Sequence, residues 1–167
     1  LLFATPAEDM LQVRDVGYVE FTYNTCTDGL HMEQCVDIKT TTQPILIAHN
    51  FFDGEHLHQR GAGEDGADGC MVIHESDTVA DQHVIEYNYF RRCKRAAIRF
   101  ASGTGTGLIS SGRVRYNLFF QTSYQEGEIP VVKAENLEFL NNTMICGRFK
   151  LGNGDQTHLP VNTLIQN

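Results

Sequence analysis

The feature of this chain that most restricts its fold is a short segment that recurs six times. Each copy has an apolar residue, two variable residues, an asparagine, one variable residue and a second apolar residue. The copies are Phe21–Cys26, Ile47–Phe52, Ile85–Phe90, Val114–Phe119, Phe139–Met144 and Leu164–Asn167, where the last copy stops at its asparagine. The steps between asparagines are 26, 38, 29, 25 and 25 residues. Since the shortest steps are about 25 residues and the others are longer, the pattern indicates coils of constant core length with loops of variable length.

A second recurring column lies upstream of the asparagine in each copy and predicts strands. It reads Val13-Arg14, Ile38-Lys39, Ile73-His74, Ile98-Arg99, Val132-Lys133 and Phe149-Lys150. Two places before the apolar member stand Leu11, Val36, Met71, Ala96, Pro130 and Gly147. This period of two is typical of strands with one buried face, and helical spacing is not sustained anywhere. We therefore predict an all-β fold, a single-stranded right-handed parallel β-helix of about six coils.

The repeated asparagine has a physical reason in such a fold. A buried tight bend between two strands leaves backbone groups that need hydrogen-bond partners. An asparagine tolerates the bend, bonds nearby backbone, and can reach the asparagine of the next coil. We expect an asparagine ladder, with the apolar residue two places later filling the interior. Those interior residues are Cys26, Phe52, Phe90, Phe119 and Met144.

Length and charge limit the classes of protein that this chain can belong to. A chain of 167 residues suits one domain, here residues 1–167, and its ends suggest a piece of a longer solenoid. The net charge of -8 argues against general nucleic-acid binding. No apolar stretch reaches the roughly 20 residues that a transmembrane helix needs. We expect loops at residues 53–69 and 101–112.

The five cysteines, Cys26, Cys35, Cys70, Cys93 and Cys146, form no CxxC pair. Their spacing therefore gives little support to a zinc or thioredoxin-like site. Because the count is odd, a complete disulfide framework is not expected. Cys35 and Cys70 occupy equivalent positions in neighbouring coils, where they form either a stack of buried thiols or a disulfide. The thiol stack is favoured because buried thiols behave as small apolar residues.

The position after the apolar residue in the upstream column is basic or histidine in all six copies. The residues are Arg14, Lys39, His74, Arg99, Lys133 and Lys150. Strand alternation places these side chains outside, where stacked like charges repel unless an anion offsets them. One interpretation is a groove for an acidic polymer. The other is that the long basic stems cover the strand surface and pair with Asp37, Glu75 or Glu135.

The segment 114–144 carries a resemblance to a known family. It contains an Asn-ladder strand, then Glu126-Gly-Glu128-Ile, then Lys133, then the turn Asn141-Asn142-Thr143. This resembles the core of polysaccharide lyase family six, the family of alginate lyases and chondroitinase B. The resemblance implies that Glu126 and Glu128 bind calcium and that Lys133 is the Brønsted base of a β-elimination. Lys150, in Phe149-Lys150-Leu151-Gly152, stands where the family has the general-acid arginine of a Leu-Arg-His-Gly motif.

This chemistry suits a uronic acid, whose C5 proton lies next to a carboxylate. Calcium would neutralise the charge that builds up on that carboxylate when the proton leaves. Arg99 and Lys150 are expected to flank Lys133 and to lower its pKa, so the three count as catalytic. Lys39, His74, Arg99 and Arg148 are expected to bind the substrate.

Three functions remain open at this point. The first is binding, and cleavage by a lyase reaction, of an anionic polysaccharide. The second is a non-catalytic β-helix that acts as a polysaccharide-binding module, adhesin or fibre segment. The third is a purely structural repeat, since the fold alone does not decide among these functions. The first two predict an extracellular or periplasmic, secreted protein.

Overall fold

The structure is a computed structural model, and it describes part of the chain. The described residues are 9–14, 16–27, 34–39, 41, 43–54, 70–73, 83–93, 96–100, 109–120, 128–131, 134–146, 148–151 and 163–167. At residues 109–111, 128–131, 134–135 and 148–151 it describes the backbone alone. Every regular element in these ranges is a strand.

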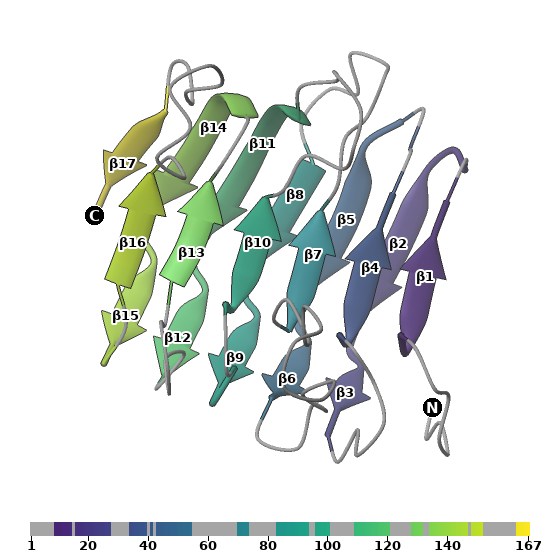
Figure 1. The fold of residues 1–167 in the computed structure, drawn as a ribbon, viewed down its shortest axis with the longest axis horizontal. Helices are drawn as coiled ribbons and strands as arrows, with labels where there is room; N and C mark the ends of the chain where they lie inside the picture. Colours follow the sequence, from purple (N-terminus) through teal and green to yellow (C-terminus); the bar gives the residue numbers. More distant parts are fainter. Residues whose placement is uncertain are drawn as a thin grey trace, which may run out of the picture.

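The strands form three parallel sheets, which the chain visits in turn (Figure 1). The first sheet contains β1 (Leu11–Val13), β4 (Val36–Ile38), β7 (Met71–Ile73), β10 (Ile98–Phe100), β13 (Glu128–Val131) and β16 (Arg148–Leu151). The second contains β2 (Val19–Thr22), β5 (Ile45–Ala48), β8 (His83–Glu86), β11 (Ile109–Arg115), β14 (Ala134–Leu140) and β17 (Leu164–Gln166). The third contains β3 (Thr25–Cys26), β6 (Phe51–Asp53), β9 (Tyr89–Arg91), β12 (Leu118–Phe120) and β15 (Thr143–Ile145). Every third strand returns to the same sheet, which confirms the predicted all-β parallel solenoid.

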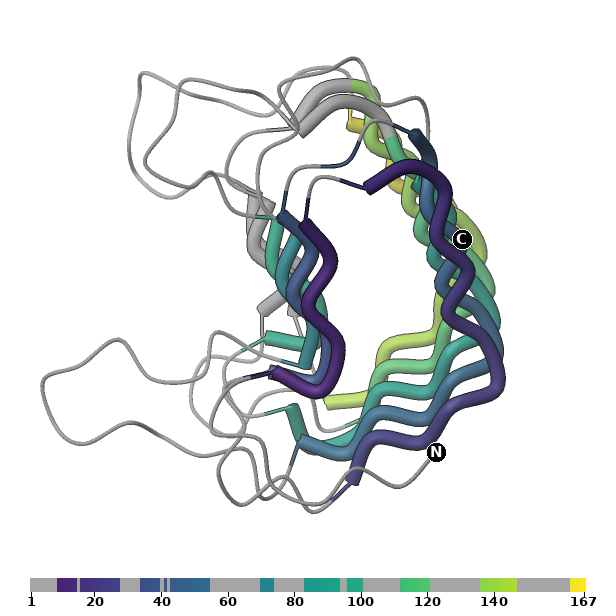
Figure 2. Tube along the Cα trace, turned by 90° about the vertical axis from the view of Figure 1, so that its right-hand side faces the viewer, coloured from purple at the N-terminus to yellow at the C-terminus, as the bar shows by residue number. Residues whose placement is uncertain are grey.

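Viewed from its end, the solenoid shows its strands superposed around one interior (Figure 2). Side chains alternate between that interior and the outer faces of the sheets, as the period of two requires. Phe52, Phe90 and Phe119 are fully buried and stack face to face, with ring centroids 4.8 and 5.1 Å apart. Cys26 is also buried, and Met144 packs against the core. The predicted interior column is therefore confirmed.

Asparagines occupy the bend between the second and third sheets and bond from coil to coil. The Nδ2 group of Asn88 donates to Asn117 Oδ1 at 3.0 Å and to the carbonyl of Ile47 at 2.9 Å. Its own Oδ1 accepts from the backbone N–H of Asn50 at 2.9 Å and from Asn50 Nδ2 at 3.0 Å. The same contacts recur along the column at Asn24, Asn50, Asn117 and Asn142. The Asn88 side chain thus satisfies two backbone groups of the preceding coil and bonds to the asparagine side chain of the next coil, and a buried bend requires such partners.

The register of the first sheet corrects the predicted upstream column. Val13, Ile38 and Ile73 align as predicted, but Ile98 pairs with Met71, and it is Phe100 that pairs with Ile73. The predicted column is therefore shifted by two residues at β10 and β16, whereas at β13 the row continues through Val131, one residue before the predicted Val132. A shift of two keeps the same residues facing inward, and a shift of one reverses the two faces, because side chains alternate with a period of two.

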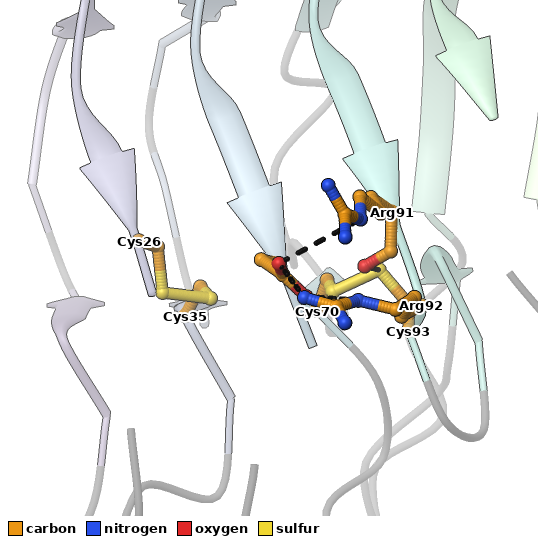
Figure 3. Close-up of a disulfide and its surroundings, with 7 residues drawn as sticks. Cys26, Cys35, Cys70, Arg91, Arg92 and Cys93 are labelled. Atoms are coloured by element: carbon orange, nitrogen blue, oxygen red, sulfur yellow. Dashed lines mark hydrogen bonds and ion pairs between the residues drawn. A yellow bond between two sulfur atoms is a disulfide. The ribbon is translucent and has the colours of Figure 1, made fainter. Parts of the chain in front are cut away.

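Two disulfides replace the predicted thiol stack (Figure 3). Cys26 bonds to Cys35, and Cys70 bonds to Cys93. Cys35 and Cys70 do lie side by side, since the Cys35 backbone N–H donates to the Cys70 carbonyl at 2.9 Å. The interpretation of this pair as thiols was wrong because each cysteine has a closer partner at the end of a third-sheet strand. Cys146 is an exposed free thiol.

Tight packing surrounds the Cys70–Cys93 disulfide. A Cβ on Gly54 would lie 2.6 Å from Cys93 Cα and 2.9 Å from Cys70 Sγ. Asp53, one residue earlier, forms a two-pronged ion pair with Arg92 beside the disulfide (Figure 3). Only glycine fits at residue 54 without moving this cluster.

Two loop predictions are corrected where they overlap described residues. Asp53 belongs to β6 rather than to the loop 53–69, and β11 begins at Ile109 rather than after residue 112. Residues 55–69 and 101–108 lie outside the described part of the chain.

Candidate functional site

The outer face of the first sheet carries most of the predicted site residues, in two rows. Phe100 pairs with Val131, and Val131 pairs with Leu151. The residues one place earlier are therefore also aligned across the three strands, and they form a row that consists of Arg99, Pro130 and Lys150. On the N-terminal side, the same row continues through Val72 and Asp37. Lys39 lies two residues after Asp37, in the row that also holds Arg14.

This arrangement corrects the single basic column. Arg14 and Lys39 lie in one row, whereas Arg99 and Lys150 lie in the other. The register places Pro130, and not Lys133, between Arg99 and Lys150. The expectation that these two basic residues flank Lys133 was therefore wrong, because Ile98 and Phe149 align with Ile129 and not with Val132.

The strands β10, β13 and β16 carry four of the predicted residues. Glu128 pairs with Arg148 in the backbone register, two residues before Pro130 and Lys150. Arg99, which is half-buried, lies on the adjacent strand β10. The structure thus places Arg99, Glu128, Arg148 and Lys150 on three consecutive strands of one sheet.

At the N-terminal end of the same face, Lys39 belongs to a cluster of charges. Its Nζ lies 2.7 Å from Oδ2 of Asp37, a carboxylate whose side chain is 1% exposed. Gln12 Nε2 donates to Asp37 Oδ2 at 3.3 Å and to Asp9 Oδ2 at 3.2 Å, so one amide bridges two carboxyl groups. The structure thus bears out the alternative in which Lys39 pairs with Asp37.

The ionisation of Asp9 depends on its burial and on its carboxylate neighbour. Burial, together with the nearby charge of Asp37, raises the pKa of Asp9 to about 6. Asp9 therefore holds its proton in mildly acidic solution, where an ordinary aspartate does not. Near neutral pH the carboxylates of Asp9 and the buried Asp37 offset the basic Arg14 and Lys39, so this end of the face carries no excess of positive charge.

Several predicted site residues lie outside the described part of the chain. These are Lys133, His74 and Glu126; for Glu128, Arg148 and Lys150 the backbone is described and the side chain is not. Among the described residues, no three histidine, cysteine, aspartate or glutamate side chains form a group that could hold a metal ion. The predicted calcium ligands Glu126 and Glu128 therefore stay predictions.

A second exposed feature was missed in the sequence. Tyr23, His49, Tyr87 and Tyr116 each directly precede a column asparagine, and their rings stack along the outside of the bend. Neighbouring centroids are 4.8, 5.1 and 5.1 Å apart, and the planes are within 10° of parallel. We call these four residues the aromatic row. The available signal was the recurrence of an aromatic residue before the asparagine in four of the six copies.

The comparisons with known proteins leave the family open. No protein-family model, curated protein or solved structure matches the chain. Within the described ranges, no helical segment is able to span a lipid bilayer.

Proposed function

We propose that this chain is a right-handed parallel β-helix of about six coils, with an asparagine ladder, that binds an anionic polysaccharide. The polymer would lie along the outer face of the first sheet, across β10, β13 and β16. The three parallel sheets and the asparagine contacts support the fold part of this proposal. The binding part rests on the charges of one face.

The observation that carries the proposal is the position of three basic residues on two strands of the first sheet that are separated by one strand. Arg99 lies on β10, and Arg148 and Lys150 lie on β16, with Glu128 on the intervening β13 as the acidic neighbour. Adjacent strands in a sheet are about 4.8 Å apart, so Arg99 and Lys150 stand about 10 Å apart across β13, where an anion can lie between them. Arginine also binds carboxylates through two parallel hydrogen bonds, which favours a uronic-acid chain over a neutral one.

The charges also indicate which end of the face the polymer occupies. Asp9 and Asp37 offset the basic Arg14 and Lys39 at the β1–β4 end, and Lys39 is already paired with Asp37. Lys39 is therefore expected to contribute little to binding. His74 stays a predicted contact.

Cleavage by β-elimination, with Lys133 as base and Glu126 and Glu128 as calcium ligands, is the second part of the proposal. The resemblance of residues 114–144 to the lyase family supports it, and β13 brings Glu128 beside Arg148. Glu126 and the side chain of Glu128 lie outside the described part of the chain, so both stay predicted calcium ligands. The non-catalytic binding module is the alternative, and it needs only the basic residues.

An extracellular or periplasmic location is proposed with this function. The Cys26–Cys35 and Cys70–Cys93 disulfides support it, since such bonds persist in oxidising compartments.

The test is a titration with an alginate oligosaccharide at low and high salt. We expect binding that weakens with salt and that falls roughly tenfold in Arg99→Ala, the loss of one charge-assisted contact of about 1.5 kcal/mol. Arg113→Ala is the matched control, because Arg113 lies on the second sheet and pairs with Glu138 at 2.8 Å. Binding that ignores salt, or that Arg113→Ala weakens as much as Arg99→Ala, contradicts the proposal.

The same samples test cleavage through the absorbance of the unsaturated product in the presence of calcium. Product formation that disappears in Lys133→Ala supports the lyase. Binding without product supports the non-catalytic module. Product formation that survives Lys133→Ala contradicts the assignment of the base.

A further inference from the structure

The aromatic row keeps a large part of its surface in water. Tyr23, Tyr87 and Tyr116 are 78%, 50% and 44% exposed, and His49 is exposed as well. The row follows the solenoid axis with one ring from each successive coil. Contiguous exposed aromatic surface of this kind generally marks an interaction site.

The backbone at these positions does not require aromatic residues. All four have φ between 54° and 57°, in the left-handed region. This conformation costs a residue with a Cβ roughly 1–2 kcal/mol, and asparagine is among the residues that tolerate it best. In the next coil the same position is Asn141, with φ of 52°. The bend therefore forms with asparagine, and the rings are an addition that the backbone does not explain.

Stacking determines which part of each ring is available to a partner. Because the ring planes are nearly parallel and about one coil apart, inner faces cover one another. The row therefore presents ring edges, which carry partial positive charge, together with phenol hydroxyl groups. Such a surface favours a partner rich in neutral oxygen atoms.

The columns on both sides of the row carry no net charge. On the second-sheet side, Glu86 and Arg115 pair with each other at 2.6 Å, beside the uncharged Thr22 and Ala48. On the third-sheet side the column is uncharged: Thr25, Phe51, Tyr89, Leu118 and Thr143. A charged polymer would find no unpaired counter-charge among these residues, since Arg115, whose guanidinium lies 5.9 Å from the centroid of the Tyr116 ring, is paired with Glu86.

We propose that the aromatic row is a second binding surface, and that it takes a neutral glycan chain running parallel to the solenoid axis. A glycan supplies hydroxyl and ether oxygens for the ring edges and phenol groups, and apolar C–H faces for the flanking Phe51 and Tyr89. Its sugars repeat along a line, as the rings do. This surface is separate from the first-sheet face, so either can fail without the other.

The test is a calorimetric titration with cellohexaose and with chitohexaose, two neutral oligosaccharides. We expect at least one to bind, with an affinity that does not change between low and high salt. Tyr87→Asn should weaken this binding at least tenfold, because asparagine keeps the bend and removes the ring. Tyr18→Asn is the matched control, since Tyr18 is 55% exposed and lies off the row, and it should bind as the wild type does.

A second readout keeps the proposal testable if a variant folds poorly. The chain has six tyrosines and no tryptophan, so tyrosine emission is observed directly. Cellohexaose or chitohexaose should change this emission in a saturable way in the wild type. Absence of binding by both sugars, equal weakening in Tyr18→Asn, or concentration-dependent dimerisation that Tyr87→Asn abolishes would overturn the proposal. The last result would assign the row to a second copy of the chain.

Discussion

Two aromatic stacks run side by side along this solenoid, one inside and one outside the same bend. The inner stack consists of Phe52, Phe90 and Phe119, which are fully buried. The outer stack is the aromatic row, whose members stand three residues before the inner rings. The column asparagines lie between the two. Ring spacing is nearly the same in both stacks, because both follow the coil repeat.

Burial explains the inner stack and fails to explain the outer one. A buried phenylalanine contributes a few kcal/mol by leaving water and by close packing. The outer rings keep about half or more of their surface in water and have a strained backbone. The same repeat therefore places the inner rings where burial stabilises the fold, and the rings of the aromatic row where a partner can reach them.

Removing an inner ring should have the largest effect. Phe90→Ala leaves a cavity between Phe52 and Phe119, and we expect a loss of about 4 kcal/mol in the free energy of unfolding. Urea denaturation measures this loss. Phe90→Leu, which keeps most of the volume, should cost about 1 kcal/mol. A loss below about 1 kcal/mol in Phe90→Ala would remove the distinction between the stacks.

Removing an asparagine between the stacks should lower the free energy of unfolding by about 3 kcal/mol. In Asn88→Ala the backbone N–H of Asn50 and the carbonyl of Ile47 lose their partners, and each buried unsatisfied group costs about 1–3 kcal/mol. Asn24→Ala is the control, since Asn24 is only half-buried and should lose less. Urea denaturation measures the loss in the free energy of unfolding. Equal losses in the two variants would show that burial does not determine how much each asparagine stabilises the fold.

Removing the Cys70–Cys93 disulfide should also lower the stability of the fold. Cys70→Ser with Cys93→Ser frees a loop with a sequence separation of 23, and we expect a loss of about 3 kcal/mol from chain entropy. The Cys26–Cys35 pair spans 9 residues and should cost somewhat less. Thermal unfolding of both double variants measures the difference. A larger loss for the shorter loop would contradict this explanation.

The pH dependence of stability distinguishes buried from exposed imidazoles. His83 is 3% exposed and accepts a hydrogen bond from the Ile45 backbone N–H through Nδ1. Desolvation by burial lowers the pKa of His83 to about 4. Between about pH 4 and 6.5 the unfolded chain therefore binds the additional proton. Stability should fall as pH decreases through this window, by about 1.4 kcal/mol per pH unit.

Asp9 acts in the opposite direction over nearly the same window. Its raised pKa means that the folded protein binds the additional proton between pH 3.8 and about 6, so stability falls as pH rises. Urea denaturation from pH 4 to 7 should therefore show that the free energy of unfolding of Asp9→Asn falls more steeply with decreasing pH than that of the wild type. In His83→Gln the free energy of unfolding should instead rise as the pH decreases. An unchanged slope in His83→Gln would contradict the neutral buried imidazole.

The smallest effect is expected from removing an outer ring. Tyr87→Asn loses stacking contacts worth roughly 0.5–1.5 kcal/mol each and relieves left-handed strain of similar size. The free energy of unfolding should therefore change by less than about 1 kcal/mol. A loss near that of Phe90→Ala in the same urea experiment would make the aromatic row a structural element.

The sequence predicted those parts of the fold in which every coil repeats the same chemistry. The asparagines and the apolar residue two places later repeat in nearly every coil, so the strands, the parallel sheets and the interior column followed from them. The register at β10 could not be predicted, because Ile98 and Phe100 are both apolar and both face inward. Disulfide pairing was equally hidden, since Cys35 and Cys70 do stack but bond to other cysteines.

The candidate site was less predictable than the fold. Rows on an outer face depend on register, so the two-residue shift divided the predicted basic column into two rows. The pairing of Lys39 with Asp37 was foreseen as an alternative, whereas the carboxyl pair of Asp9 and Asp37 was not. The aromatic residues that directly precede the asparagines were a clear signal for the aromatic row. This signal was missed because it belongs to no strand or ligand pattern.

The central claim is that the asparagine column holds the coils in this register. Hydrogen exchange of the asparagine side-chain amides, followed by NMR, tests it most directly. The claim predicts strongly slowed exchange for the Nδ2 protons of Asn50, Asn88 and Asn117, which bond to the next asparagine and to a backbone carbonyl. Asn141, which is exposed, should exchange rapidly. Rapid exchange at Asn88 would contradict the claim.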